Sequence, residues 1–279
     1  MFDTARPVGE LLREWRQRRR LSQLDLALDA EISTRHLSFL ETGRSSPSRD
    51  MLLRLAEQLE VPLRERNALL VAAGFAPVFP ERRIDDPALG AARRAMDLVL
   101  TGHEPYPALA VDRHWTMVAA NRAVAPLLAG VAPALLQPPV NVLRVGLHPE
   151  GLAPRTVNLW EWRGHLLARL RRQVDLSADP VLADLLRELS EYKVAPPRRP
   201  TRPVEEAAIV IPLQLATEWG VLSLISTTTV FGTPVDLTVA ELALETFFPA
   251  DAATADVLRR IAAQPADAPS MRNAAQAAP

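Results

Sequence analysis

The apolar positions of residues 8–74 repeat with the period of α-helices, in five short segments that follow one another closely. In the first segment apolar side chains recur three and four positions apart, at Val8, Leu11, Leu12 and Trp15. A serine that can cap free backbone N–H groups precedes the next three segments, at Ser22, Ser33 and Ser48. Glycine, which accepts a left-handed backbone, follows the third and fifth, at Gly43 and Gly74. This pattern predicts an all-α domain of five helices.

Behind this helical region the pattern changes to alternating and β-branched runs, which are typical of strands. The predicted strands are a hairpin at 107–111 and 115–120, followed by 208–215 and 219–231. The predicted helices lie around 88–100, from 158 onward and through 182–189, whereas the type of 235–248 is left open. This order predicts an α+β domain with an antiparallel sheet and flanking helices.

Polar stretches that contain proline divide the chain. Residues 80–87 are predicted to link a domain of residues 1–79 to a second domain of residues 88–264. Residues 195–203 hold four prolines and three arginines, which predicts an exposed, extended loop. The last residues, 265–279, are small, polar and interrupted by proline, and predict a disordered tail.

Composition excludes several kinds of enzyme. Of the 32 basic residues 31 are arginine, and the one lysine, Lys193, has no glycine-rich approach. A phosphate-binding loop, a Schiff-base enzyme and a kinase-type ATP site each need a suitably placed lysine. The absence of cysteine excludes disulfides, thiolate zinc sites and iron–sulfur ligation. No two of the five histidines have the spacing of a helical metal pair, so we predict neither metal nor cofactor.

The chain carries no sign of membrane targeting. Its first fifteen residues contain three acidic side chains and no continuous apolar stretch, unlike a signal peptide. No apolar run reaches the roughly 18–20 residues that a membrane span requires. We therefore expect a cytoplasmic protein without a membrane partner.

The predicted third helix has two chemically different faces. Ile32, Leu37 and Leu40 recur at intervals suited to packing on the first two helices. The opposite face carries a guanidinium, hydroxyl groups and an aromatic ring, from Thr34, Arg35, Ser38, Phe39 and Thr42. An arginine fork can bind guanine, hydroxyls can bind base edges or phosphate, and a ring can contact the thymine methyl. This second face suits the major groove of DNA.

Net charge alone does not support DNA binding. Residues 1–79 hold 12 arginines against 11 acidic residues, which leaves open a helical bundle that binds no DNA. Five of the arginines lie within 13–20, however, and Arg35, Arg44 and Arg49 surround the third helix. Segregated charge of this kind can produce a local basic surface.

The first domain resembles the five-helix DNA-binding domain of the XRE, or phage-repressor-type, regulators. The resemblance rests on SQLDLA at 22–27, ISTRHLSFLETGR at 32–44, PS at 47–48 and LLRLA at 52–56. It implies a helix-turn-helix that binds double-stranded DNA, with contacts from Arg16, Gln23, Ser33, Thr34, Arg35, His36, Ser38, Phe39 and Arg44. The chain departs from the family at Glu31, where a glycine is common in the turn, and this puts the shape of the turn in question.

The second domain resembles the PAS-like ligand-binding domain of the MmyB-like transcription regulators, which follows an XRE domain. The resemblance rests on AVDRHW at 110–115, AANRA at 119–123, LHPEG at 147–151, NLWEWR at 158–163 and ETFFPAD at 245–251. It implies a sheet and helices around an apolar cavity, with a fatty-acid-like or similar hydrophobic small molecule as ligand.

A ligand of this kind with a carboxylate would need an aliphatic pocket and one or two polar donors. The candidates are Asn121, Arg122, His148, Asn158, Trp162, Arg163 and His165. Each has a structural alternative. Asn121 can cap a helix, Trp162 can belong to the core, and His165 can make a structural hydrogen bond. Arg163 and Arg169 are expected to be solvated charges on a helix.

Three hypotheses follow for the whole chain. The first is a transcription regulator that binds DNA as a homodimer and responds to a hydrophobic ligand. The second is an enzyme with an attached DNA-binding domain, although neither a nucleophile–base pair nor a nucleotide loop is visible. In the third, the second domain only dimerises or contacts other proteins. The sequence favours the first hypothesis.

Overall fold

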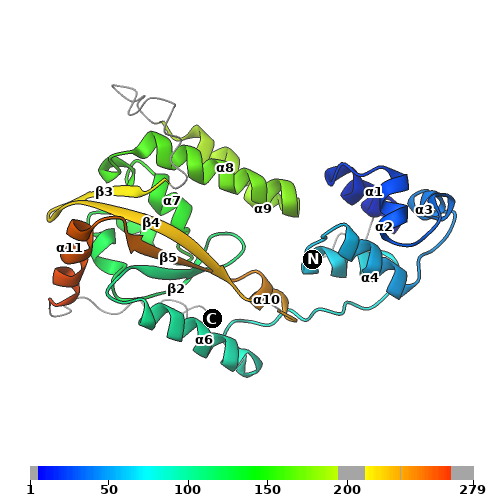
Figure 1. Cartoon of the computed structure of the whole chain (residues 1–279), viewed down its shortest axis with the longest axis horizontal. Helices are drawn as coiled ribbons and strands as arrows, with labels where there is room; N and C mark the ends of the chain where they lie inside the picture. Colours follow the sequence, from blue (N-terminus) through cyan, green and yellow to red (C-terminus); the bar gives the residue numbers. More distant parts are fainter. Residues whose placement is uncertain (1–5, 194–210, 233, 265–279) are drawn as a thin grey trace. The chain divides into compact units, whose positions relative to one another are not determined.

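A computed structural model describes residues 6–193, 211–232 and 234–264. The chain divides into two compact units, and the first runs to Arg82 and includes the segments Gln173–Ala178 and Pro234–Ala240. The second unit contains the sheet and the other helices (Figure 1). The predicted proline-rich loop at 195–203 and the predicted tail at 265–279 lie outside the described residues.

The first unit contains the five predicted helices. They are α1 (Val8–Arg18), α2 (Gln23–Asp29), α3 (Thr34–Glu41), α4 (Arg49–Gln58) and α5 (Leu63–Ala72). The capping box before α2 is formed, since Asp25 N donates to the Ser22 hydroxyl and Ser22 N donates to the Asp25 carboxylate. Ser33 and Ser48 cap α3 and α4 in the same way through their hydroxyls. Local capping chemistry therefore defines where these helices begin.

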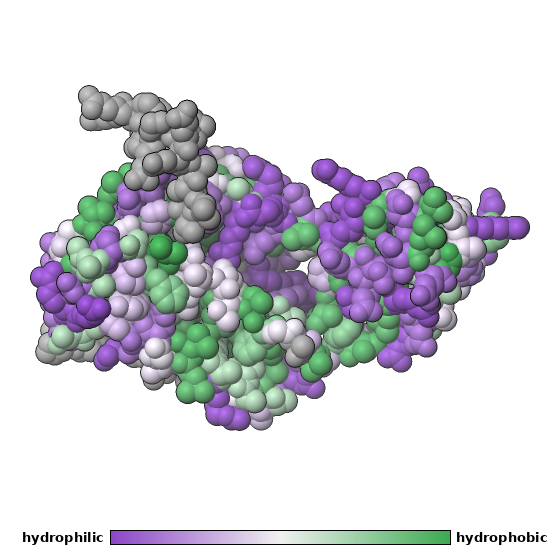
Figure 2. Space-filling model, in the orientation of Figure 1, coloured by the Kyte–Doolittle hydropathy of each residue, from purple (hydrophilic) through white to green (hydrophobic). Residues whose placement is uncertain are grey.

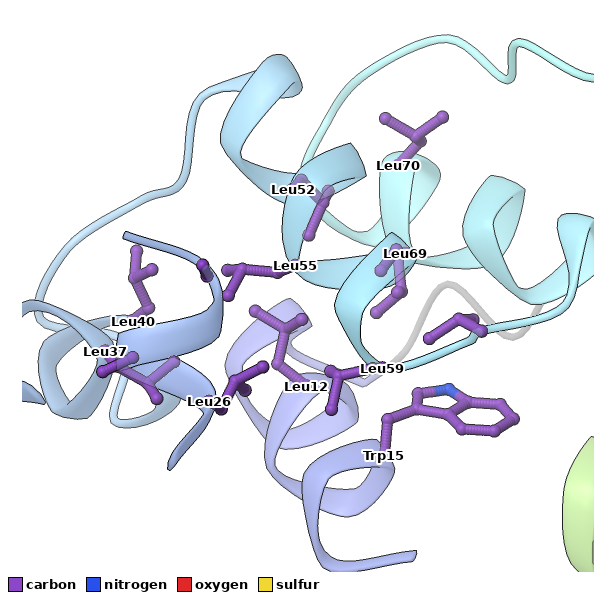
Figure 3. Packing of buried hydrophobic residues seen from close by; sticks show 14 residues of the cluster. Leu12, Trp15, Leu26, Leu37, Leu40, Leu52, Leu55, Leu59, Leu69 and Leu70 are labelled. Atoms are coloured by element: carbon purple, nitrogen blue, oxygen red, sulfur yellow. The ribbon is translucent and has the colours of Figure 1, made fainter. Parts of the chain in front are cut away.

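The helices of the first unit enclose a single leucine-rich core. Leu12, Leu26, Leu37, Leu55 and Leu70 are fully buried, and Figure 3 shows side chains from all five helices meeting there. Burial of each such side chain contributes about 1.5–3 kcal/mol. Helices α1 and α3 approach closely at Gly9, where an added Cβ would lie 2.3 Å from the Leu40 carbonyl oxygen.

The turn between α2 and α3 has the shape that glycine would give it. Glu31 has a φ of 56°, in the left-handed region. Its N–H donates to the Leu28 carbonyl, and the N–H of Ile32 donates to the Ala27 carbonyl. The chain keeps a tight helix-turn-helix connection, and the strain falls on an ordinary residue instead of changing the turn.

The second unit is built on one five-stranded antiparallel sheet in the order β2-β1-β5-β4-β3. The strands are β1 (Ala108–Val111), β2 (Met117–Ala120), β3 (Leu213–Thr217), β4 (Gly220–Val230) and β5 (Ala243–Pro249). The predicted hairpin and the two later strands are confirmed within the described residues. Residues 235–248, whose type the sequence left open, contain a short helix, α10 (Leu237–Ala240), and most of β5. Strand β5 pairs with β1 of the hairpin on one side and with β4 on the other.

Helices flank both faces of this sheet. On one face α6 (Gly90–Gly102) packs through Met96 and Leu100 against Ala108, Ala110 and Leu244. Figure 1 shows α8 (Leu159–Ser177) and α9 (Pro180–Glu191) on the opposite side. The sequence interpretation left out α7 (Val142–Leu147) and α11 (Ala252–Ala262), although Asn141 and Asp251 cap them as typical helix starts.

Hydrophilic residues cover much of the visible face of the first unit, with separate apolar patches between them (Figure 2). Two of the exposed apolar side chains of this unit, Leu24 and Leu28, lie one turn apart on α2. Among the described residues, no helix combines the length and apolar character that crossing a membrane would require.

Candidate functional site

Two arginines, Arg35 on α3 and Arg44 shortly after its end, lie around one aromatic ring. The Cζ atom of Arg35 lies 5.3 Å from the centroid of the Phe39 ring, and that of Arg44 lies 5.8 Å from it. Both arginines are exposed, and Phe39 is half-buried. Cation–π contact holds the guanidinium groups over the ring and leaves their N–H groups free to face a nucleic acid. This cluster has the chemistry that the sequence predicted for a DNA-reading face.

The other predicted DNA-contacting side chains at α3 are partly engaged in local structure. Ser33 accepts a hydrogen bond from His36 N as the helix cap, and Thr34 and Ser38 are half-buried. The His36 ring lies against α4, with Nε2 3.3 Å from Met51 Sδ. This contact occupies one ring nitrogen of a half-buried side chain, and the prediction that His36 contacts DNA stays a prediction.

Arg16 is not a phosphate contact, contrary to the prediction. It is only 9% exposed, and Nε and Nη2 donate to the two oxygens of Glu41, at 2.6 and 2.9 Å. Its pKa is raised because the guanidinium hydrogen-bonds that carboxylate. Glu41 also accepts a hydrogen bond from Gln23 Nε2 at 2.8 Å. The buried pair thus ties α1 to α3 and fixes the side chain of Gln23 at the start of α2.

A cavity of about 120 Å³ lies in the second unit, between the sheet and the helices α7 and α8. Alternate residues of the strands face it, and apolar residues of the helices close it. The strands supply Leu109, Met117, Leu213, Leu215, Leu224 and Phe247, and the helices supply Leu143, Val145, Trp162 and Leu166. Such walls suit the burial of an apolar molecule.

Among the described lining residues, hydroxyl or charged side chains occur at four positions: Thr156, Arg169, Ser226 and Glu245. The guanidinium of Arg169 donates from Nη1 to Glu245 Oε2 at 3.0 Å and from Nη2 to Oε1 at 2.6 Å. The hydroxyl of Thr228 joins the pair, since it accepts from Arg169 Nη2 and donates to Glu245 Oε1. The Cζ atom of Arg169 lies 4.6 Å from the Trp115 ring centroid. The ion pair and the indole therefore form a polar corner of the cavity.

The backbone at Trp115 is strained. This buried residue has a φ of 64°, which is uncommon for a large side chain. Asp112 holds the turn, because its Oδ1 accepts hydrogen bonds from His114 N and Thr116 N, each at 2.8 Å. Strain of this kind collects at ligand sites in proteins, and here it places the indole in the cavity wall.

Of the seven predicted ligand residues, only Trp162 lines the cavity. Asn121 does not cap an α-helix, since its segment forms a short 3₁₀ turn, Ala125–Leu128. Its amide instead joins three backbone groups, accepting from Ala108 N and donating to the carbonyls of Leu100 and Tyr106. Asn158 similarly bonds the backbone of Pro212 and Gln214, beside β3. Both amides hold the fold together.

The remaining predicted ligand residues also have partners outside the cavity. Arg122 pairs with Glu104 at 2.7 Å, and His148 accepts from Glu150 N at 3.0 Å. Arg163 donates to the carbonyls of Leu189 and Ser190 at the end of α9. His165 stacks on Trp162 with ring centroids 5.6 Å apart. Burial lowers the pKa of His165, and the positive charges of Arg169 and Arg172 lower it further.

The expectation that Arg163 and Arg169 are solvated charges is wrong. Arg163 holds α9, and Arg169 forms the polar corner with Glu245 and Trp115, neither of which was a candidate. In the sequence, Glu245 stood out only as the first residue of the ETFFPAD motif and as a carboxylate amid the apolar positions of a possible strand. Its partner stands 76 residues away, so the pairing depends on the fold.

Comparison with known proteins agrees with this architecture. Residues 92–261 match the MmyB-like transcription regulator ligand binding domain, and residues 12–66 match a helix-turn-helix model. Over 116 residues the chain is 34% identical to a protein of Methanoculleus marisnigri described as an HTH-type transcriptional regulatory protein. That match covers 40% of this chain and 37% of the relative's length. The chain belongs to the MmyB-like transcription regulators, and it carries an XRE-type helix-turn-helix ahead of their ligand-binding domain.

Proposed function

We propose that this chain binds a double-stranded DNA operator as a homodimer, and that a hydrophobic, fatty-acid-like molecule in the cavity changes its affinity for that operator. Residues 1–79 would form the DNA-binding domain and residues 88–264 the sensor, with 80–87 as the link between them. The proposed activity is control of transcription and not catalysis.

The arginine–phenylalanine cluster of α3 is the observation that carries the DNA-binding part. Arg35 and Arg44 are exposed on one face, where a guanidinium can bind guanine O6 and N7 bidentately. Gln23, held by Glu41 at the start of α2, occupies the position from which helix-turn-helix proteins contact the DNA backbone. Ser33, Thr34 and Ser38 complete the proposed contact set.

The cavity supports the ligand-binding part. Its volume of about 120 Å³ is close to that of the ~150 Å³ apolar cavity, engineered in another protein, that takes up benzene. Walls of leucine, valine and aromatic residues with a polar corner suit a short apolar chain that ends in one polar group. The proposed fatty-acid-like ligand is therefore a short apolar chain with one polar end group, whether or not that group is a carboxylate.

For ligand binding to change the affinity for DNA, the ligand must bind one arrangement of the protein more tightly than another. A symmetric dimer should then protect two related half-sites whose centres lie about 10 base pairs apart. DNase footprinting with and without added ligand tests both statements. Protection of a single, asymmetric half-site would contradict the dimer, and an identical footprint and affinity in saturating ligand would contradict the coupling.

Native mass spectrometry of the purified protein gives a second, independent test. A bound mass of the size of a small lipid supports sensing by the second domain. A protein that carries no small molecule and takes up none from a panel of medium-chain lipids would favour a domain that only dimerises.

A further inference from the structure

We propose that the ligand of this cavity has an uncharged polar end, such as an alcohol, aldehyde, ester or amide, and that Glu245 is the residue that excludes carboxylates. This inference rests on the proposed ligand-binding function and specifies the chemical class of the ligand.

The charges of the cavity wall already balance. Among the described residues that line the cavity, only Arg169 and Glu245 are charged, and they neutralise each other through two hydrogen bonds. Glu245 is 4% exposed, and the Arg169 side chain is 20% exposed, so both lie largely out of water. A carboxylate ligand would add a second negative charge to this corner, where few water molecules could screen it. It could bind Arg169 fully only by displacing Glu245, which would then be buried without its partner.

An uncharged oxygen can still find a donor here. Within the described residues, the hydrogen bonds of Arg169 use three of its N–H groups, two toward Glu245 and one toward Thr228. A guanidinium has five N–H groups, so two can donate to a ligand oxygen while the ion pair stays intact. The indole of Trp115 covers the guanidinium on one side and provides an apolar surface for the adjoining carbon chain. The corner therefore offers hydrogen bonds without offering a free charge.

The test compares alcohols with carboxylates of equal chain length. Hexanol, octanol and decanol, and the corresponding carboxylate salts, are titrated calorimetrically into the full chain at neutral pH. We expect at least one alcohol to bind, and to bind at least about tenfold more tightly than its carboxylate. Equal or tighter binding of the carboxylates by the unaltered protein would overturn the proposal, while leaving the ligand-binding function intact. If no alcohol and no carboxylate bound, the ligand-binding function itself would fail, and this inference with it.

Substitution of Glu245 gives the decisive readout. Glu245→Gln keeps the shape but removes the negative charge, so the carboxylates should gain at least about tenfold in affinity while the alcohols change little. Glu218→Gln makes the same change of charge at an exposed turn between β3 and β4, and should alter neither series. A thermal melt confirms that each variant is folded. A folded Glu245→Gln protein with an unchanged preference would refute the role of this residue.

Discussion

Arg16 and Glu41 form a bidentate ion pair inside the helix-turn-helix domain, with their residues only 9% and 6% exposed. Twenty-five positions separate them in the chain, yet together they join α1 to the last residue of α3. Gln23 shares the same carboxylate, so the pair also fixes the position of a side chain that we propose as a DNA contact.

Breaking this pair should destabilise the first unit strongly. Arg16→Met leaves the Glu41 carboxylate buried without its cation, which costs about 3–5 kcal/mol of unfolding free energy. Arg16→Met combined with Glu41→Leu should recover most of that loss, because no buried charge is left unpaired. Hydrogen exchange of the α1 and α3 amides measures the effect.

Arg18→Met is the matched control, since Arg18 pairs with Glu14 at the surface of the same helix. Exposed pairs contribute about 0–1 kcal/mol, so this variant should exchange nearly like the unaltered protein. Equal protection in Arg16→Met and Arg18→Met would contradict the structural role of the buried pair.

The two arginines over Phe39 should affect DNA binding differently. Arg35→Ala removes a side chain from the groove-facing side of α3, and should relax the preference at one base position by about 1–3 kcal/mol. Arg44 follows the helix, so Arg44→Ala should weaken binding to all sequences alike and reduce the salt slope by about 1. Binding to a randomised operator library at two salt concentrations separates these effects. An unchanged preference profile for Arg35→Ala would show that the reading face lies elsewhere.

Relief of the left-handed turn should stabilise the domain. Glu31→Gly removes the steric cost of a φ of 56°, offset by the greater freedom of glycine in the unfolded chain, for a net gain of about 0.5–1 kcal/mol. The same replacement at Glu57, exposed within α4, should instead lose about 1 kcal/mol. Urea denaturation of both variants checks the opposite signs. A loss of stability in Glu31→Gly would mean that contacts of the glutamate outweigh the strain.

Acidification should weaken the second unit through His165. Its pKa in the folded protein lies below the ordinary 6.5, because burial and the nearby charges of Arg169 and Arg172 oppose protonation more than Glu245 favours it. The unfolded chain therefore binds more protons, and stability rises with pH through this window and falls as the pH drops below 6.5. His165→Gln should flatten this part of the stability profile. A profile with the same slope in the variant would assign the pH dependence to another group.

Local sequence determined much of this protein. Serine caps, the capping box at Ser22 and glycines after the helices define the first domain, because these signals act within four residues. Arg35 and Phe39 could be placed on one face from their spacing alone, since residues four apart on a helix are neighbours. The two family resemblances rest on the same local motifs, and both hold.

Only the tertiary structure decided which polar residues are partners. The sequence suggested a DNA contact for Arg16 and a solvated charge for Arg169, but Glu41 and Glu245 pair with them across 25 and 76 residues. Asn121 likewise looked like a helix cap and instead joins the first residue of β1 to the carbonyls of Leu100, in α6, and Tyr106. Which charges and amides pair over long sequence separations depends on how strands and helices pack. The pattern of residues along the chain does not show which distant residues come together. The first domain could therefore be predicted from local sequence. For the second domain the family resemblance implied an apolar cavity, but the polar corner and most of the lining residues were visible only in the fold.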